Sequence, residues 1–287
     1  MDDLHDYELD QPDPEFLEAP PPKQFPMGLW LAVIAVLLGI AGAGYIALHV
    51  PPRLELAPMA PRAAAPSQEA TTSLGGVGDP ISLPPLDETD AVVRGLVRTL
   101  SSNPIVGKWL STDGLIRNFT VVVANIAEGA TPAKQLRALR PDTPFDVTES
   151  GRTFYIDARS YHRYDTLAHA VDSIDPRGAA RLYATLKPRI DDAYRDLGIQ
   201  GRSLDQTLET AIVRLLETPV VDGRIRVTPK GIGYRYADDR LEDLTAAQRQ
   251  LLRMGPENMR LIQQSLRRIA AALGVREGRL PPTPHQP

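Results

Sequence analysis

The sequence contains no cysteine, and this absence excludes several chemistries at once. Disulfide bonds, thiol nucleophiles, iron–sulfur clusters and cysteine-based zinc sites all need that residue. The compartment stays open, because cysteine-free domains occur in reducing and in oxidising surroundings. Lysine is scarce as well, since the 32 basic residues are 27 arginines and 5 lysines. Guanidinium groups suit forked contacts with phosphate or carboxylate, although an arginine bias more often reflects genomic base composition.

Recognised catalytic motifs are also missing. The chain has no GxGxxG behind a strand, no GxxxxGK[ST], no HExxH and no GxSxG. A run of closely spaced glycines at 75–78 lies in a proline-rich stretch and not between a strand and a helix. We therefore expect no catalytic residues, no metal site and no cofactor, which favours a binding protein over an enzyme.

Acidic residues are concentrated at the N-terminus. Residues 1–26 hold eight carboxylates, one lysine and six prolines. A segment of this composition buries too little apolar surface to fold, so we expect a disordered acidic tail. The chain carries a net charge of −4, but the part behind the tail holds 31 basic and 28 acidic residues. This near balance predicts no nucleic-acid partner.

An uncharged apolar run follows at residues 27–50. As a helix it rises about 36 Å, enough to cross a hydrocarbon core of about 30 Å. Trp30 and Tyr45 lie near its two ends, where aromatic side chains settle at membrane interfaces. The run is too long, and the segment before it too acidic, for a cleaved signal peptide. Its apolar character on all sides argues against a buried core helix, so the sequence predicts one transmembrane helix.

Small side chains recur along one face of this helix, at Ala35, Gly39, Ala43 and Ala47. Such spacing lets two helices approach closely in a bilayer. We therefore expect self-association into a homodimer through this face, although glycine and alanine are common in membrane anchors generally.

The orientation of the helix rests on few charges. Lys23 precedes it and Arg53 and Arg62 follow it, too few basic residues for the positive-inside rule to decide. A short tail, one anchor, a proline-rich spacer and a folded domain form a common bacterial arrangement with the domain outside. We accordingly expect a bacterial inner-membrane protein with a periplasmic domain.

The remaining chain divides into a linker, a domain and a tail. Residues 51–85 are rich in proline and alanine without an apolar period, which predicts a disordered linker. Residues 86–275 show helical periodicity. Residues 276–287 are polar and proline-rich, so we expect a second disordered tail.

The domain is predicted to be mainly α-helical with a small β-hairpin. Its helix starts are marked by cap residues, followed by proline or by a capping box. These starts lie at Asn103, Thr131, Asp175, Ser203 with Gln206, Thr245 with Gln248, and Pro256. The segment 113–128 is predicted as a helix, with a buried strand as the alternative because of its valine run. Strands are predicted at 154–157, 224–228 and 233–236, the last two forming the hairpin.

Two candidate sites fall within or directly beside the segment 160–172. If this segment is one helix, His162, Asp165, His169 and Asp172 share a face, as for a divalent metal or a hydrolase. The two imidazoles would then lie about 10 Å apart along the axis, which favours a solvated polar face.

The second candidate site is a binding surface of tyrosine and charged side chains. It comprises Arg159, Tyr161, Arg163, Tyr164 and Asp165. Tyrosine and arginine are enriched where proteins recognise partners. The same residue types also cover helical cores, and this alternative stays open.

Several longer motifs together resemble an uncharacterised bacterial family catalogued only as a domain of unknown function. They are LPPLDETD at 83–90, VVVANIAEG at 121–129, SYHRYD at 160–165, GAARLYATLKP at 178–188 and LLRMGPENMRLIQ at 251–263. The resemblance covers about residues 83–275. It implies an N-terminal anchor, a proline-rich spacer and a helical domain in a proteobacterial envelope. It supplies no activity and no catalytic residues.

Two functions follow as hypotheses. The first is a membrane-tethered binding or scaffolding protein of the cell envelope, whose domain binds another protein or a cell-wall component. The alternative is a membrane-tethered hydrolase that uses His162, Asp165 and His169. The tether and the missing motifs favour the first.

Overall fold

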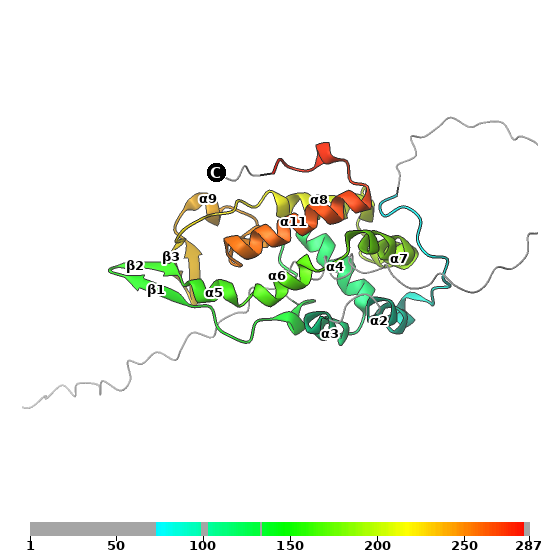
Figure 1. Ribbon diagram of the computed structural model, residues 1–287, viewed down its shortest axis with the longest axis horizontal. Helices are drawn as coiled ribbons and strands as arrows, with labels where there is room; N and C mark the ends of the chain where they lie inside the picture. The colour runs from blue at the N-terminus through cyan, green and yellow to red at the C-terminus, as the bar shows by residue number, and fades with distance from the viewer. Residues whose placement is uncertain (1–72, 99–102, 133, 284–287) are drawn as a thin grey trace, which may run out of the picture.

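The computed structural model describes residues 73–98, 103–132 and 134–283, which form a mainly helical body with a small antiparallel sheet at one end (Figure 1). No helix within these ranges is both long enough and apolar enough to cross a membrane. The predicted anchor at 27–50 lies outside the described residues, together with its small-residue face (Ala35, Gly39, Ala43 and Ala47) and the acidic tail. The anchor therefore stays a prediction.

Helix α4 (Leu115–Ala127) lies at the centre of the core. It packs against α7 (Pro176–Asp196) and α8 (Leu204–Leu216). Val122, Val123 and most of its other apolar side chains are buried. The valine run is thus helical, and the strand alternative is wrong. Helix packing on several sides outweighs the mild preference of valine for strands.

The predicted helix starts are confirmed at four cap residues. Side-chain oxygens of Asn103, Asp175, Ser203 and Thr245 each accept a backbone N–H in the first turn of a helix. These caps open α3 (Pro104–Leu110), α7, α8 and α10 (Ala246–Leu252). The last helix, α11 (Pro256–Leu273), begins at the predicted proline and packs against α6 (Asp165–Asp172), α7 and α8.

The helix predicted to start at Thr131 does not form. After Pro132 the described chain makes turns and the short 3₁₀ turn η3 (Arg137–Leu139), and it then reaches the sheet without regular secondary structure. The remaining short elements are η2 (Leu86–Glu88), α2 (Asp90–Arg98), η3 (Arg137–Leu139), α5 (Ala158–His162), α6 (Asp165–Asp172), α9 (Asp239–Glu242) and η4 (Glu277–Arg279).

The sheet has four antiparallel strands in the order β1-β2-β3-β4. They are β1 (Val147–Ser150), β2 (Thr153–Ile156), β3 (Arg226–Lys230) and β4 (Gly233–Tyr236). The predicted hairpin of β3 and β4 is confirmed, but it is half of the sheet. Strand β2 pairs with β3 through Phe154 and Val227, which joins distant parts of the chain.

Residues 73–85, which the sequence analysis assigned to the linker, pack along the domain. We call this segment the strap. Leu74 is buried and donates its amide to Asp205 at 3.2 Å, and Asp79 donates its amide to the Thr185 hydroxyl at 2.8 Å. Side chains of α7 and α8 accept hydrogen bonds from the backbone of the strap. Apolar periodicity does not reveal contacts of this kind, so the sequence alone did not predict that the strap is ordered.

The C-terminal segment also has more structure than expected. Of the predicted tail 276–287, residues 276–283 are described and include η4. Arg279 pairs with Glu209 of α8 at 2.8 Å, and Arg267 of α11 donates to the carbonyl of Pro282 at 3.1 Å. Polar contacts hold this segment, and hydrophobic periodicity does not detect such contacts.

Candidate functional site

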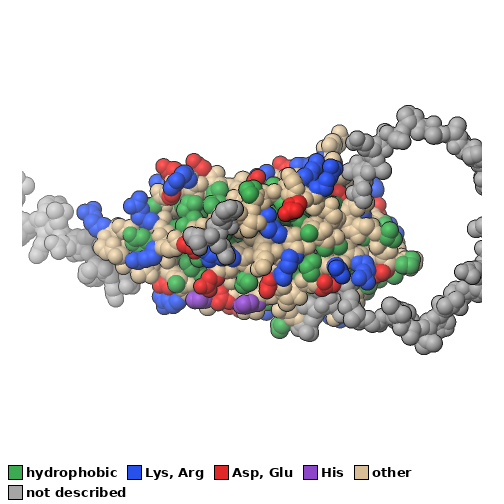
Figure 2. All heavy atoms as spheres, turned by 45° about the horizontal axis from the view of Figure 1, so that its top comes forward, with side chains coloured by type: hydrophobic (Ala, Val, Ile, Leu, Met, Phe, Trp, Pro, Cys, Tyr) green, Lys and Arg blue, Asp and Glu red, His purple; other side chains and the backbone are tan. Residues whose placement is uncertain are grey.

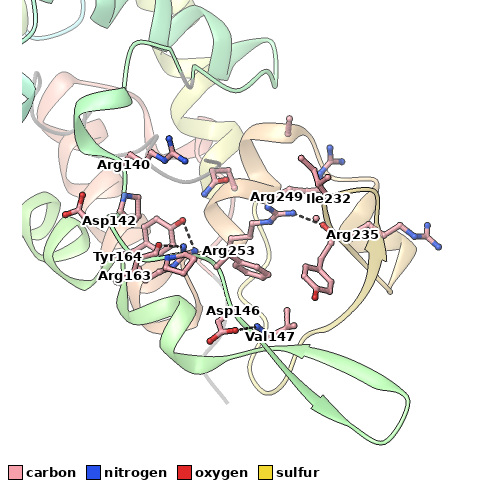
Figure 3. Close-up of a pocket in the computed structure, with 18 of the residues that line it drawn as sticks. Arg140, Asp142, Asp146, Val147, Arg163, Tyr164, Ile232, Arg235, Arg249 and Arg253 are labelled. Carbon is pink, nitrogen blue, oxygen red and sulfur yellow. Dashed lines mark hydrogen bonds between the residues drawn. The ribbon is translucent and has the colours of Figure 1, made fainter. Parts of the chain in front are cut away.

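A pocket of about 1050 Å³ lies where the sheet meets the helical body (Figure 3). Its walls are the segment 137–147, the hairpin of β3 and β4, and α10 with the residues that follow it. Seven basic and three acidic residues line it. The basic ones are Arg137, Arg140, Arg163, Lys230, Arg235, Arg249 and Arg253, and the acidic ones are Asp142, Asp146 and Glu242. This excess of positive charge contrasts with the net −4 of the whole chain.

Two of the guanidinium groups lie over the same aromatic ring. The guanidinium carbons of Arg163 and Arg253 are 5.6 and 5.7 Å from the centroid of Phe145. Arg163 donates to the carbonyls of Ser160 at 2.9 Å and Thr143 at 3.0 Å. These contacts fix both guanidinium groups without neutralising them, because a ring and a carbonyl carry no full negative charge.

Neither Arg163 nor Arg253 forms an ion pair within the part of the chain that the structure describes. Arg253 instead donates to the carbonyl of Tyr234 at 3.1 Å. Burial lowers the pKa of Arg163, and the positive charge of Arg253 lowers it further. The carboxylate of Asp146 partly opposes this but is paired with Arg159 at 3.2 Å. The pocket therefore holds concentrated and poorly compensated positive charge.

Arg249 adds to this charge from α10. Its guanidinium donates to the carbonyl of Leu244 at 2.7 Å and to the carbonyl of Glu242. The carboxylate of Glu242 faces elsewhere: it accepts the amide of Tyr236 at 3.1 Å and lies 3.5 Å from Lys230. Arg249 is thus positioned by backbone oxygens in the same way as Arg163.

Gln250 is the buried polar side chain of the pocket wall. It is 2% exposed, and neither its Nε2 nor its Oε1 has a hydrogen-bond partner among the described residues. Burial raises the pKa of Tyr164, and the nearby Gln250 amide opposes that effect, so the two groups are neighbours. An unpartnered amide in a pocket wall leaves one donor and one acceptor for a ligand.

The structure divides the predicted binding surface. The expected single helix over 160–172 is broken into α5 and α6 between His162 and Asp165. Arg163 and Tyr164 occupy the break and line the pocket, where Tyr164 is buried (Figure 3).

The other three residues of that surface lie outside the pocket. Arg159 is exposed and pairs with Asp157 at 3.0 Å. Tyr161 packs its ring against Gly255, and its buried hydroxyl has no partner among the described residues. Asp165 accepts from Asn258 at 2.9 Å.

The predicted histidine and aspartate face lies open on the surface, where Figure 2 shows histidine side chains. His162 Nδ1 lies 2.9 Å from Asp165 Oδ2, and these side chains are 65% and 44% exposed. His169 is exposed, and Asp172 pairs with Arg268 at 2.6 Å. None of the four residues lines the pocket. Within the described ranges, no three His, Asp or Glu side chains are grouped closely enough to hold a metal ion.

Sequence reasoning missed Phe145, Arg249, Gln250 and Arg253. The last three lie within one turn at the end of α10. The signal available in the sequence was a pair of arginines four residues apart, which places both on one face of a helix. Phe145 had no signal, because its segment carries no recognisable period. The pocket forms only when this segment and β3 meet.

Fold and pocket together define a mainly helical domain with an arginine-lined pocket. The family described as "Protein of unknown function (DUF3014)" matches residues 115–270, more than half of the chain, and the chain belongs to this family. The match confirms the predicted resemblance to a family of unknown function. It includes the whole pocket but not the strap. Neither a curated protein nor a solved structure matches the chain.

Proposed function

We propose that this chain is a membrane-tethered binding protein of the bacterial envelope whose folded domain captures an anionic ligand in the arginine-lined pocket. One observation carries the proposal: Arg163 and Arg253 lie over Phe145 without an ion pair among the described residues, beside the unpartnered amide of Gln250. Buried charges and buried amides are normally paired, so this combination indicates groups that await a ligand.

An anionic ligand fits the pocket for electrostatic reasons. Partial burial removes water that would otherwise stabilise the guanidinium groups, which is why the pKa of Arg163 is lowered. A carboxylate or phosphate would replace that water with charge-assisted hydrogen bonds. The pocket is also large enough for a ligand of some size, since it holds about 1050 Å³.

The tether part of the proposal rests on the sequence. The uncharged run 27–50 is long enough to span a bilayer, and the chain between it and the strap is short. We propose that this run anchors the chain in the inner membrane with the domain in the periplasm. Its face of Ala35, Gly39, Ala43 and Ala47 would support a homodimer. A reporter fused after Pro287, active only outside the cytoplasm, tests the orientation: an inactive fusion would place the domain inside.

The alternative, a membrane-tethered hydrolase, has less support. Its favourable feature is the hydrogen bond between His162 and Asp165, which resembles a base and its orienting carboxylate. Both side chains are solvated, and neither they nor His169 line the pocket. A substrate held by the pocket would therefore not meet this pair.

The binding proposal is tested with the full chain in detergent micelles and glutarate, citrate or inorganic phosphate as the added anion. A ligand at 100 times its dissociation constant stabilises the folded state by about 2.7 kcal/mol, which a thermal melt resolves. The double variant Arg163→Gln with Arg253→Gln should weaken binding by about 30-fold or more.

Two further variants make this test specific. Gln250→Met keeps both arginines and should also weaken binding, which covers the case in which the double variant does not fold. Arg240→Gln is the matched control, because Arg240 is 89% exposed and pairs with Asp238 outside the pocket. If no anion stabilises the wild-type protein, or if Arg240→Gln weakens binding as much as the pocket variants, the proposal is wrong.

A further inference from the structure

The solvent-facing side of the sheet is basic. Phe154, Val227 and Tyr236 lie opposite one another in the register, and this row packs toward the core. Side chains alternate along a strand, so the residues between them point to the other side. That outer side carries Tyr155, Arg226, Thr228 and Arg235, with Arg224 just before β3. We call these five residues the sheet face.

The arginines of the sheet face lack carboxylate partners among the described residues. The guanidinium carbon of Arg224 lies 4.0 Å from the ring centroid of Tyr155, and Arg235 Nε donates to the Thr228 hydroxyl at 3.2 Å. Arg226 is exposed. Figure 2 shows basic side chains gathered at the end of the molecule where the sheet lies. Positive charge is thus concentrated on this side of the sheet.

The sheet face is continuous with the pocket. Arg235 belongs to both, because it lines the pocket while its side chain extends away from Arg249 and Arg253 (Figure 3). Arg224 and Arg226 are two residues apart, which separates them by about 7 Å along the chain. Arg235 lies on β4 opposite Thr228, the next outward-facing position of β3. A single extended ligand could therefore contact the pocket and the sheet face together.

An extended ligand that contacts all these arginines would carry several negative charges, and two features indicate its chemical class. The Gln250 amide offers one donor and one acceptor, which match the carbonyl and N–H of a peptide group. Guanidinium groups match carboxylates as planar forks. A membrane surface is disfavoured, because the strap, where the tether joins, and the sheet lie at opposite ends of the long axis (Figure 1).

We infer that the ligand is an acidic peptide segment of a partner protein, which inserts into the pocket and extends along the sheet face. This inference rests on the proposed function, since it identifies the class of ligand that the pocket takes. Inside the pocket the peptide pairs its backbone with Gln250 and a carboxylate with Arg163 and Arg253. Outside it, further carboxylates pair with Arg224 and Arg226.

The experiment uses the full chain in detergent micelles and a fluorescently labelled peptide of alternating Glu and Ser, with glutarate as the small probe of the pocket alone. The double variant Arg224→Gln with Arg226→Gln changes exposed side chains that do not line the pocket, and it should fold. We expect it to bind the peptide about 5-fold more weakly, from two exposed ion pairs, while its affinity for glutarate is unchanged.

A matched variant controls for net charge. It replaces two exposed arginines of α7, at the opposite end of the domain, by glutamine: Arg177 and Arg181. This variant should keep the wild-type peptide affinity. A peptide of alternating Gln and Ser should bind far more weakly than the acidic one, and added salt should weaken acidic-peptide binding less in the sheet-face variant than in the wild type.

Each outcome separates the two levels of the proposal. If glutarate binds normally and the sheet-face variant keeps full peptide affinity, the extended peptide is wrong and the anion pocket stands. If polyphosphate displaces the peptide more effectively than polyglutamate, the ligand class is wrong. If neither glutarate nor the peptide binds the wild-type protein, the proposed function itself fails.

Discussion

The substitution Gln250→Met tests the central observation directly. The amide of Gln250 is buried without a hydrogen-bond partner among the described residues. Leaving such a group unsatisfied costs about 1–3 kcal/mol, and methionine has nearly the same length and shape without the polar atoms. We expect the ligand-free variant to be more stable than the wild type by about 1 kcal/mol, because the neighbouring Tyr164 hydroxyl offsets part of the gain.

Two measurements on the full chain in detergent should move in opposite directions. A stabilisation of about 1 kcal/mol raises the midpoint of thermal unfolding by about 2–4 °C for a domain of this size. The affinity for glutarate should fall at the same time, since the ligand loses the amide. A gain in stability together with a loss of affinity is expected where a residue of a binding site destabilises the ligand-free protein.

Gln248 provides the matched control on the same helix. Its side chain accepts the amide of Thr245 at 3.1 Å and donates to the carbonyl of Arg214 at 3.1 Å. Gln248→Met should therefore destabilise the protein by about 1–2 kcal/mol and leave anion binding unchanged. If Gln250→Met destabilised the protein as much as Gln248→Met, the Gln250 amide would already have a partner and the reasoning would be refuted.

Two other predictions concern stability. Tyr161→Phe removes a buried hydroxyl that has no partner among the described residues, so it should stabilise the protein by about 1 kcal/mol in a thermal melt at neutral pH. Burial raises the pKa of Tyr161 to about 12. The wild type should therefore lose stability relative to the variant as pH rises from about 10, and no such change is expected below that range. Gly78→Ala would place a Cβ 2.3 Å from the backbone nitrogen of Thr185, so limited proteolysis should cleave the strap faster. Gly95→Ala, on an exposed turn of α2 with open space, should instead stabilise the protein by about 1 kcal/mol and leave the strap protected.

Much of the helical body was predictable because its signals are local. Caps such as Ser203 with Gln206 and Thr245 with Gln248 act within one turn, so a sequence window contains both partners. The apolar stripe of α11 has the same property, since residues three and four apart share a face. The caps correctly identified where these helices begin without any knowledge of the tertiary structure.

The sheet and the pocket were less predictable because they depend on distant pairing. The hairpin of β3 and β4 has a local turn and was found, whereas β1 is a short exposed strand without clear alternation. The pairing of Phe154 with Val227 brings two separate segments together, and no window contains both. Arg163 was singled out from its residue type, but Arg253 became its neighbour only through this arrangement.

The false helix at Thr131 has an instructive cause. A threonine followed by proline satisfies the rule for a helix start, but Pro132 is followed by turns and η3. A start signal fixes the first turn only, and continuation needs a buried stripe that the segment from 134 to 146 lacks. The irregular segment that results forms the wall of the pocket that contains Phe145. The helix-start signal at Thr131 thus fails in the segment that forms a wall of the candidate site, and departures from such local rules are expected at functional sites.

The strap gives the proposed tether a defined point of attachment. Asp205 accepts the amide of Leu74 at 3.2 Å, and the same carboxylate accepts from Tyr183 at 2.5 Å and Lys187 at 2.9 Å. Any pull on the chain before residue 73 is thus borne by α7 and α8, two long helices of the core. The pocket and the sheet face lie at the other end of the domain, away from the strap (Figure 1). A tether attached at the strap would leave the opposite, basic end of the domain unobstructed and directed away from the membrane. A tethered domain that binds partners beyond the membrane requires this arrangement.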